Sequence, residues 1–109
     1  MRRRRKQTNG IGHPEASTRM VIRLYVAGKA PNSVRAIANL SSICDEYLKD
    51  NYELEIIDIL KQPLRALIDG VLLTPTLAKV SPQPPTRVVG NLSERSNVLL
   101  ALGLTDKMT

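Results

Sequence analysis

The stretch Leu72-Leu-Thr-Pro-Thr-Leu-Ala-Lys-Val80 decides how the rest of the chain folds. Pro75 has a fixed φ and no N–H for a sheet ladder, so it suits only the start or the edge of a strand. Thr74 precedes that proline and is therefore disfavoured in the helical region. The alternation that follows predicts a strand over Thr76–Val80, which the chain enters through Thr-Pro-Thr.

Upstream of this stretch, the pattern predicts a strand, a helix and a second strand. Met20–Val26 is β-branched and largely apolar, which is typical of a strand covered on both faces. The helix that follows runs to about Leu48, with Ser33 or Asn32 as its N-cap. Tyr52–Ile59 is the second strand, and a connection of this length demands a right-handed parallel crossover. The apolar stripe of the helix consists of Ile37, Leu40, Cys44 and Tyr47.

A short helix precedes the Thr-Pro-Thr stretch. Pro63 suits its first turn and Gly70 is a natural stop. Arg65 and Asp69 are spaced to pair across one turn. The edge that we expect this helix to bury consists of Leu64, Leu67 and Ile68.

Downstream, a strand and a helix complete the pattern. Arg87–Val89 follows a proline-rich turn and predicts a fourth strand, antiparallel to the third. The last helix begins at a Ser93 cap and ends at Gly103, with Val98, Leu99 and Leu102 facing inward. The order β-α-β-α-β-β-α predicts an α/β domain of the thioredoxin-like type, with a mixed four-stranded sheet and helices on both faces.

Charge divides the chain into an arm and a domain. The net charge is +6, and five of the positive charges lie in Arg2–Lys6. We therefore expect a flexible basic arm over 1–18, a domain over 19–104 and a frayed tail over 105–109. The arm is either a solvated tail or a contact with an acidic protein or nucleic acid.

Composition excludes several classes of protein. With three Tyr and no Phe or Trp, the chain has few platforms for stacking bases, which argues against a nucleic-acid binder. No apolar run approaches the roughly 18 to 20 residues that cross a bilayer, so we expect no membrane contact. The lone Cys44 allows no intrachain disulfide and suits a reducing cytoplasm.

Catalytic and metal-binding patterns are missing from the sequence. It has no Cys-x-x-Cys pair, no cluster of metal ligands and no glycine-rich phosphate loop. Ser33 has no visible base, and Asp58 and Asp69 are single carboxylates that we expect to be structural. Cys44 lies on an apolar stripe and is expected to be a core residue. We therefore predict a protein that is not an enzyme and that binds no cofactor or metal.

Several blocks at matching spacing carry a family resemblance: Leu24-Tyr-Val-Ala-Gly28, Pro31-Asn-Ser-Val-Arg-Ala36, Ile57-Asp-Ile-Leu-Lys61, Pro63, Thr74-Pro-Thr-Leu-Ala-Lys79 and Val88-Val-Gly-Asn-Leu-Ser93. On these residues the chain resembles KaiB, a small clock adaptor, over about Val21 to Leu104. The resemblance implies a non-catalytic adaptor that binds the KaiC ring ATPase in a thioredoxin-like state and modulates its phosphorylation or ATPase cycle. It further implies a KaiA-like protein or a clock histidine kinase as possible partners, and self-association to a dimer or tetramer through a second fold of the same sequence.

The resemblance also assigns roles to single residues. Partner-binding positions carry over onto Arg35, Lys79 and Arg87, and with less weight onto Lys61; each is otherwise a solvated surface charge. The expected structural positions are Pro75, which we expect to be cis, together with Gly28, Gly90 and Ala101.

The chain departs from the family pattern at several positions. Gly70 and Thr86 stand where relatives often have basic residues, and Asn91 replaces an aspartate. These departures keep open a stress-response adaptor with another partner; a redox enzyme is the remotest alternative. Ala101 stands in place of a helix glycine, and alanine favours a helix over glycine by roughly 0.5–1 kcal/mol. Since two packings of a metamorphic protein differ by only a few kcal/mol, we expect the thioredoxin-like state to predominate.

Overall fold

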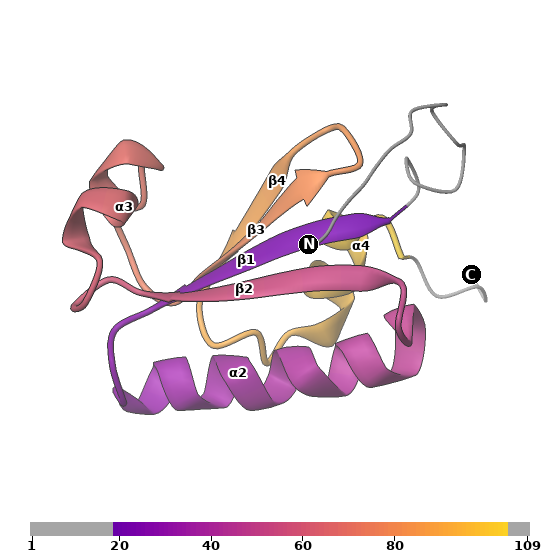
Figure 1. The fold of residues 1–109 in the computed structure, drawn as a ribbon. Coiled ribbons are helices and arrows are strands. Elements are labelled where there is room, and N and C mark those ends of the chain that lie inside the picture. Colours follow the sequence, from indigo (N-terminus) through magenta and orange to yellow (C-terminus); the bar gives the residue numbers. More distant parts are fainter. Residues whose placement is uncertain (1–18, 105–109) are drawn as a thin grey trace.

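Four strands form one mixed sheet in the order β2-β1-β3-β4 (Figure 1). The computed structural model describes residues 19–104, so the expected arm and tail lie outside the described residues. The strands are β1 (Met20–Val26), β2 (Tyr52–Asp58), β3 (Thr76–Ser81) and β4 (Thr86–Val89). β1 pairs parallel with β2 and antiparallel with β3, which pairs antiparallel with β4. The predicted mixed four-stranded sheet is confirmed, with its parallel crossover and with a fourth strand antiparallel to the third.

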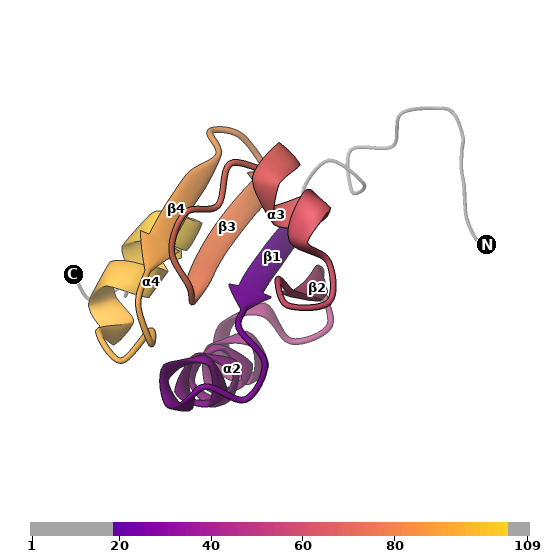
Figure 2. The ribbon, with the colours of Figure 1, turned by 90° about the vertical axis from the view of Figure 1, so that its left-hand side faces the viewer.

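The helices lie on both sides of this sheet, as predicted. They are α2 (Pro31–Ile43), α3 (Pro63–Ile68) and α4 (Arg95–Leu102), and α2 continues as a π-helical turn, η1 (Cys44–Leu48). Figure 2 shows α2 and α4 on one side of the sheet and α3 on the other, near one end of the strands. β1 begins and α4 ends at the end of the molecule opposite α3 (Figure 1).

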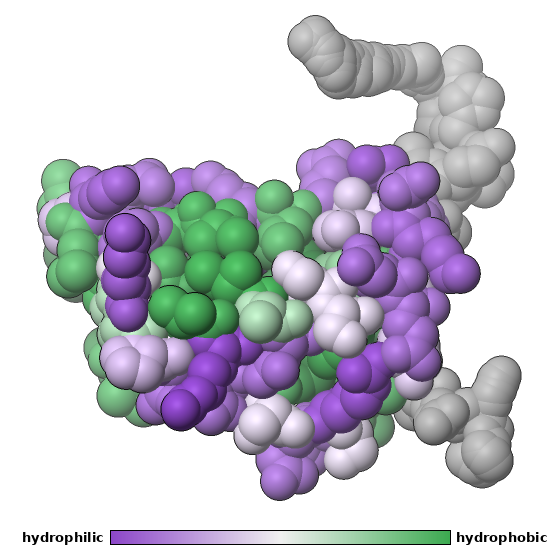
Figure 3. Space-filling model, turned by 90° about the horizontal axis from the view of Figure 1, so that it is seen from below, coloured by the Kyte–Doolittle hydropathy of each residue, from purple (hydrophilic) through white to green (hydrophobic). Residues whose placement is uncertain are grey.

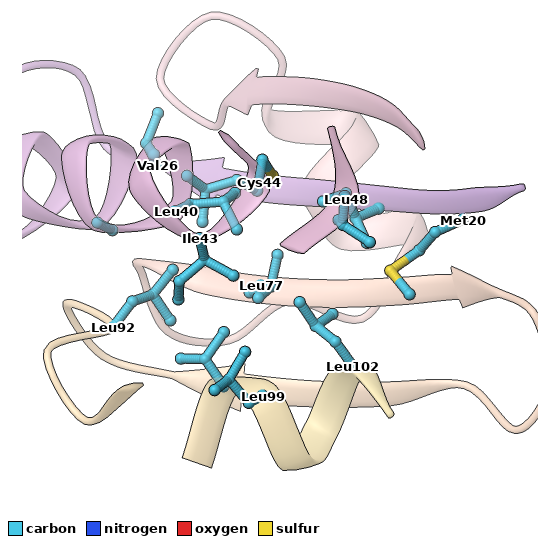
Figure 4. Close-up of a cluster of buried hydrophobic side chains, with 14 residues drawn as sticks. Met20, Val26, Leu40, Ile43, Cys44, Leu48, Leu77, Leu92, Leu99 and Leu102 are labelled. Atoms are coloured by element: carbon cyan, nitrogen blue, oxygen red, sulfur yellow. The ribbon is translucent and has the colours of Figure 1, made fainter. Parts of the chain in front are cut away.

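The main core lies between the sheet and the pair α2 and α4. Alternate residues of β1 point into it, because side chains along a strand alternate between faces. Leu40, Ile43 and Cys44 meet them from α2 and η1, and the predicted inward residues of α4 are all buried. Figure 4 shows the aliphatic side chains of α2, β3 and α4 converging on this layer. Cys44 is confirmed as a core residue, since it is 1% exposed within this cluster. Its burial raises the pKa of the thiol to about 11.

Two predicted helix caps are wrong. α2 begins earlier, at Pro31, and Ser33 is buried inside its first turn, where its Oγ accepts a hydrogen bond from the N–H of Ala27. α4 begins at Arg95 with Glu94 in the N-cap position, and neither helix has a side-chain cap. In α2, the hydroxyl of Ser33 therefore stabilises the preceding loop instead of capping the helix, and Pro31 has the φ that the first helical turn requires.

The Thr74–Pro75 peptide bond is cis, as predicted, and the Ser81–Pro82 and Gln83–Pro84 bonds are cis as well. Gly28 and Gly90 have φ of +55° and +123°, which residues with a side chain rarely adopt. Within the described residues, no helix is long and apolar enough to cross a membrane.

Candidate partner-docking surface

Large apolar side chains are exposed on and beside α3. Leu64, Leu67 and Ile68 occupy one face of this helix, at the spacing i, i+3, i+4, and are 70–80% exposed. The sequence predicted that this edge is buried, and the prediction is wrong. Ala66 is the buried residue of α3. The six-residue helix lies at the end of the sheet, so only a small part of its surface packs inward.

Three leucines in the flanking loops extend this exposed surface. Leu60 precedes α3, and Leu72 and Leu73 follow it, with exposures from 63% to 93%. We define the α3 patch as Leu60, Leu64, Leu67, Ile68, Leu72 and Leu73. Monomeric proteins rarely expose large aliphatic side chains together, and such a patch typically marks a protein–protein interface. Sequence reasoning missed these residues, although Leu72 and Leu73 carried a signal: they lie outside every predicted strand and helix.

Polar contacts hold α3 against the sheet. Arg65 binds both carboxylate oxygens of Glu55, with N–O distances of 2.8 and 3.1 Å. Its Nε donates to Asp69 at 3.0 Å, as the predicted i,i+4 pair requires. Asp69 also accepts a hydrogen bond of 2.7 Å from the hydroxyl of Tyr25, a buried residue of β1. α3 is therefore fixed by charge-assisted hydrogen bonds, which leave its leucines outside.

These contacts shift the pKa of each carboxyl in the same direction. The hydrogen bond from Tyr25, followed by the one from Arg65, holds the pKa of Asp69 below its usual range. The hydrogen bonds from Arg65 lower the pKa of Glu55. Burial, followed by the bond to Asp69, raises the pKa of Tyr25. Each shift favours the charged carboxylate and the neutral phenol, so the network is complete at neutral pH.

The β1–α2 loop lies where oxidoreductases with this fold place their thiols, and here it is closed by structural hydrogen bonds. Asp58 accepts from the N–H of Gly28 and from the N–H of Leu60, each at 3.0 Å. The carboxylate therefore ties this loop to the start of the α3 patch, the structural role expected of it. Across residues 19–104, no group of three or more His, Cys, Asp or Glu side chains could hold a metal ion.

The four predicted partner-binding cations do not form one cluster. Arg35 is exposed on α2, and its guanidinium lies 3.4 Å from the side-chain oxygen of Asn32. Lys61 is exposed in the loop before α3, beside the α3 patch. Arg87 lies on β4 and donates to the carbonyl oxygens of Asp69 and Gly70, at the end of α3. Lys79 is only 6% exposed and offers a partner little surface in this state.

A second apolar area lies on the α2 side of the molecule. Figure 3 views the molecule from that side and shows apolar residues gathered over the half of the face nearer α3, with hydrophilic residues around them. Val34 of α2 and Ile56 of β2 are exposed there. Ile37 is partly buried and packs against the core. The exposed apolar surface is therefore concentrated at the end of the molecule that carries α3.

The site of the Asp-to-Asn departure is part of the fold. The side-chain oxygen of Asn91 accepts from the N–H of Ser93 at 3.0 Å, and its backbone carbonyl accepts from the side chain of Asn39 at 2.8 Å. The residue therefore shapes the turn before α4 and links it to α2.

Comparisons with known proteins agree with this geometry. The family described as KaiB domain matches residues 23–104. A relative from Thermostichus vulcanus, named circadian clock oscillator protein KaiB, is 51% identical over 84 residues, which cover 77% of this chain and 78% of the relative. The N-terminal domain of SasA from Synechococcus elongatus superposes with a TM-score of 0.63 at 18% identity, covering 83% of this chain and 89% of that domain. Chloroplastic thioredoxin z superposes with a TM-score of 0.59 at 18% identity, over 69% of each chain, so the fold is thioredoxin-like.

Proposed function

The chain belongs to the KaiB family and is a clock-related adaptor, and from that premise we propose that it docks on a KaiC-type ring ATPase through the α3 patch. On this proposal the protein performs no chemistry itself. It alters the phosphorylation or ATPase cycle of the ring by occupying part of its surface.

The exposure of the α3 patch is the observation that supports this proposal best. Burying a leucine or isoleucine side chain that is otherwise exposed contributes about 1.5–3 kcal/mol. The α3 patch offers six such side chains, clustered in fourteen residues of sequence. Because α3 is already fixed by Arg65, docking does not have to order the helix first. A pre-organised apolar surface of this kind suits the centre of an interface.

Cations border the α3 patch and suit the rim of the same interface. Lys61 adjoins it in sequence, and Arg87 reaches the end of α3 from β4. Rim charges act on the association rate and its salt dependence more than on the lifetime of the complex. We therefore assign Lys61 and Arg87 to steering, and the leucines to affinity. Arg35, on α2, belongs to the steering group only if the interface extends over the α2 side.

A binding experiment with a purified KaiC-type ATPase tests the docking surface. We expect Leu67→Lys combined with Ile68→Lys to weaken binding at least ten-fold, mainly by faster dissociation, because two apolar anchors are lost. Leu100→Lys is the matched control, since Leu100 is 68% exposed on α4, away from α3. Equal binding by the α3 variant and the control would remove the α3 patch from the interface.

A second experiment tests the cations. Arg35→Ala and Lys61→Ala are compared with the unmodified chain at low and high salt. Removing a steering residue lowers the association rate at low salt and has little effect at high salt. Association rates that do not change in Arg35→Ala would take Arg35 out of the interface.

A further inference from the structure

A hollow of about 620 Å³ lies on the sheet face that α2 and α4 leave uncovered, between the end of α3 and the β3–β4 hairpin. The strand register explains how it forms. Arg23 of β1 lies opposite Ala78 of β3, and Ala78 lies opposite Arg87 of β4. Paired residues point to the same face of a sheet, so two arginines flank one alanine. Since neighbouring strands are about 4.8 Å apart, the hollow has a small side chain as its floor and a guanidinium on either side.

The charges around the hollow do not balance within the described residues. Arg65 makes the close contacts to both nearby carboxylates, Glu55 and Asp69, at 2.8 and 3.0 Å. Arg23 lies at 3.7 Å from Glu55 and 3.8 Å from Asp69, beyond hydrogen-bond distance. Arg87 donates to two backbone carbonyl oxygens. Arg23 therefore makes only long ion pairs with these two carboxylates, and three guanidinium groups face two carboxylates, which leaves one positive charge in excess. Arg23, Lys79 and Arg87 line the hollow together with Asp69.

We propose that this hollow binds a small molecule that carries an oxyanion, a phosphate or a carboxylate, between Arg23 and Arg87. Guanidinium groups bind both oxyanions through pairs of parallel N–H donors. The amide of Gln83 lines the same hollow and offers a further donor. The volume lies in the range of small-molecule sites and exceeds what a single ion fills. Val80 and Pro85 also line the hollow, and their apolar side chains suit the body of the molecule.

Binding at this site leaves α3 in place. A guanidinium has five N–H donors, and the two bonds from Arg87 to the end of α3 use two of them. Arg87 can therefore hold α3 and an oxyanion at once. The site is separate from the α3 patch, because none of the six residues of that patch lines the hollow.

NMR titrations of the isotopically labelled full-length protein test the proposal. Sodium phosphate and sodium acetate are added in separate titrations at constant ionic strength, and the shifts of the amide signals report binding. We expect saturable shifts that centre on the amides of Arg23, Ala78, Gln83 and Arg87. Arg23→Gln and Arg87→Gln should each weaken binding at least ten-fold, while Arg35→Gln, on α2, binds as the unmodified chain does. Tighter binding of phosphate identifies a phosphate-bearing ligand, and tighter binding of acetate identifies a carboxylate.

Shifts that do not saturate, or that spread equally to the amides around Arg35, would overturn the proposal, and so would unchanged affinity in Arg23→Gln. If Arg87→Gln loosens the contact between α3 and β4, the affinity of Arg23→Gln decides whether the proposal holds. Unlike Arg87, Arg23 makes no hydrogen bond to the α3 backbone among the described residues. The spectrum of each variant without ligand reports whether it folds. No partner protein enters the experiment, so its outcome is independent of docking on an ATPase.

Discussion

At the scale of single residues, Asp69 is the point where three parts of the molecule meet. Its carboxylate joins Tyr25 of β1 and Arg65 of α3, and its backbone carbonyl accepts from Arg87 of β4. The carboxylate is largely buried, with 16% of the side chain exposed. A partly buried carboxylate that accepts several hydrogen bonds is stabilised as the anion, so its contribution to stability depends on pH.

Asp69→Asn should lower the free energy of unfolding at pH 7 by about 1.5–3 kcal/mol, the range for hydrogen bonds to charged groups. Because the folded-state pKa of Asp69 is lowered, its contribution is complete above the unfolded-state value of about 4. It is lost as the pH falls through the lowered folded-state value. Urea unfolding at pH 7 and at pH 3 should therefore show a difference between variant and unmodified chain that shrinks in acid. Asp50→Asn, at an exposed position, should change the free energy of unfolding by no more than about 0.5 kcal/mol at either pH. A loss of stability in Asp69→Asn that is the same at both pH values would contradict the role assigned to Asp69.

Gly28 and Gly70 make a matched pair for testing the β1–α2 loop. Both have positive φ, +55° and +70°, but a Cβ on Gly28 would lie 3.1 Å from Cδ1 of Leu60, whereas a Cβ on Gly70 meets nothing within 4 Å. Each substitution by alanine should cost about 1 kcal/mol for the backbone strain, and Gly28→Ala should cost more because Leu60 must move. Thermal unfolding measures the difference; a larger loss in Gly70→Ala would be the contrary result.

At the scale of elements, α3 and α4 are held by different forces. α3 buries one alanine and depends on charge-assisted hydrogen bonds, whereas α4 buries Val98, Leu99 and Leu102 in the main core. Arg95 of α4 adds an ion pair with Glu46 and stacks over the ring of Tyr47, 5.5 Å from its centre. α4 is therefore the better anchored of the two helices in this fold.

Ala101→Gly tests whether the helical state of α4 depends on its alanine. The substitution should weaken the helix by about 1 kcal/mol, and if a second packing lies within a few kcal/mol it becomes more populated. NMR assignment over residues 60–104 should show a helix at Arg95–Leu102 in the unmodified chain and a larger fraction of another state in the variant. Ala38→Gly makes the same change in α2 and should leave α4 helical. A strand at 95–102 in the unmodified chain would contradict our expectation for this sequence.

Periodicity predicted the type and order of every element but failed on the exposure of α3. The spacing of Leu64, Leu67 and Ile68 was correct, yet a helical stripe shows only that apolar residues share a face. Whether that face meets the sheet depends on how Glu55 and Asp69 orient Arg65, and these contacts join β2 to α3 across the fold. The hollow beside Arg23 was equally out of reach, because it depends on the register of β1, β3 and β4. Gly28 was predictable, since its backbone geometry follows from residue type, whereas the cis bond before Pro75 was predictable only from the family resemblance, because about 5–6% of X–Pro bonds are cis.

At the scale of the whole molecule, apolar surface is concentrated at one end. The α3 patch lies at that end, and so do the exposed residues Val34, near the start of α2, and Ile56, near the end of β2 (Figure 1). Such an end suits two kinds of contact, docking on a partner and contact between copies of this chain. Both remove the same side chains from water, so we expect them to compete.

Leu67→Lys combined with Ile68→Lys should shift the chain toward the monomer, because two cations replace the centre of the α3 patch. Sedimentation equilibrium over a range of concentrations measures the change in the association constant. Leu100→Lys, on α4, introduces one lysine where the α3 variant introduces two, and it should leave the association constant unchanged. Self-association that persists in the α3 variant would place the contact between copies elsewhere.

The placement of the two ends of the described chain has a practical consequence. β1 starts and α4 finishes far from α3 (Figure 1). A peptide tag joined before β1 or after α4 would attach the protein to a sensor chip or bead by the end that lies far from α3, which leaves the α3 patch accessible. Immobilised in this way, the protein can be tested against candidate partners without covering the proposed docking surface.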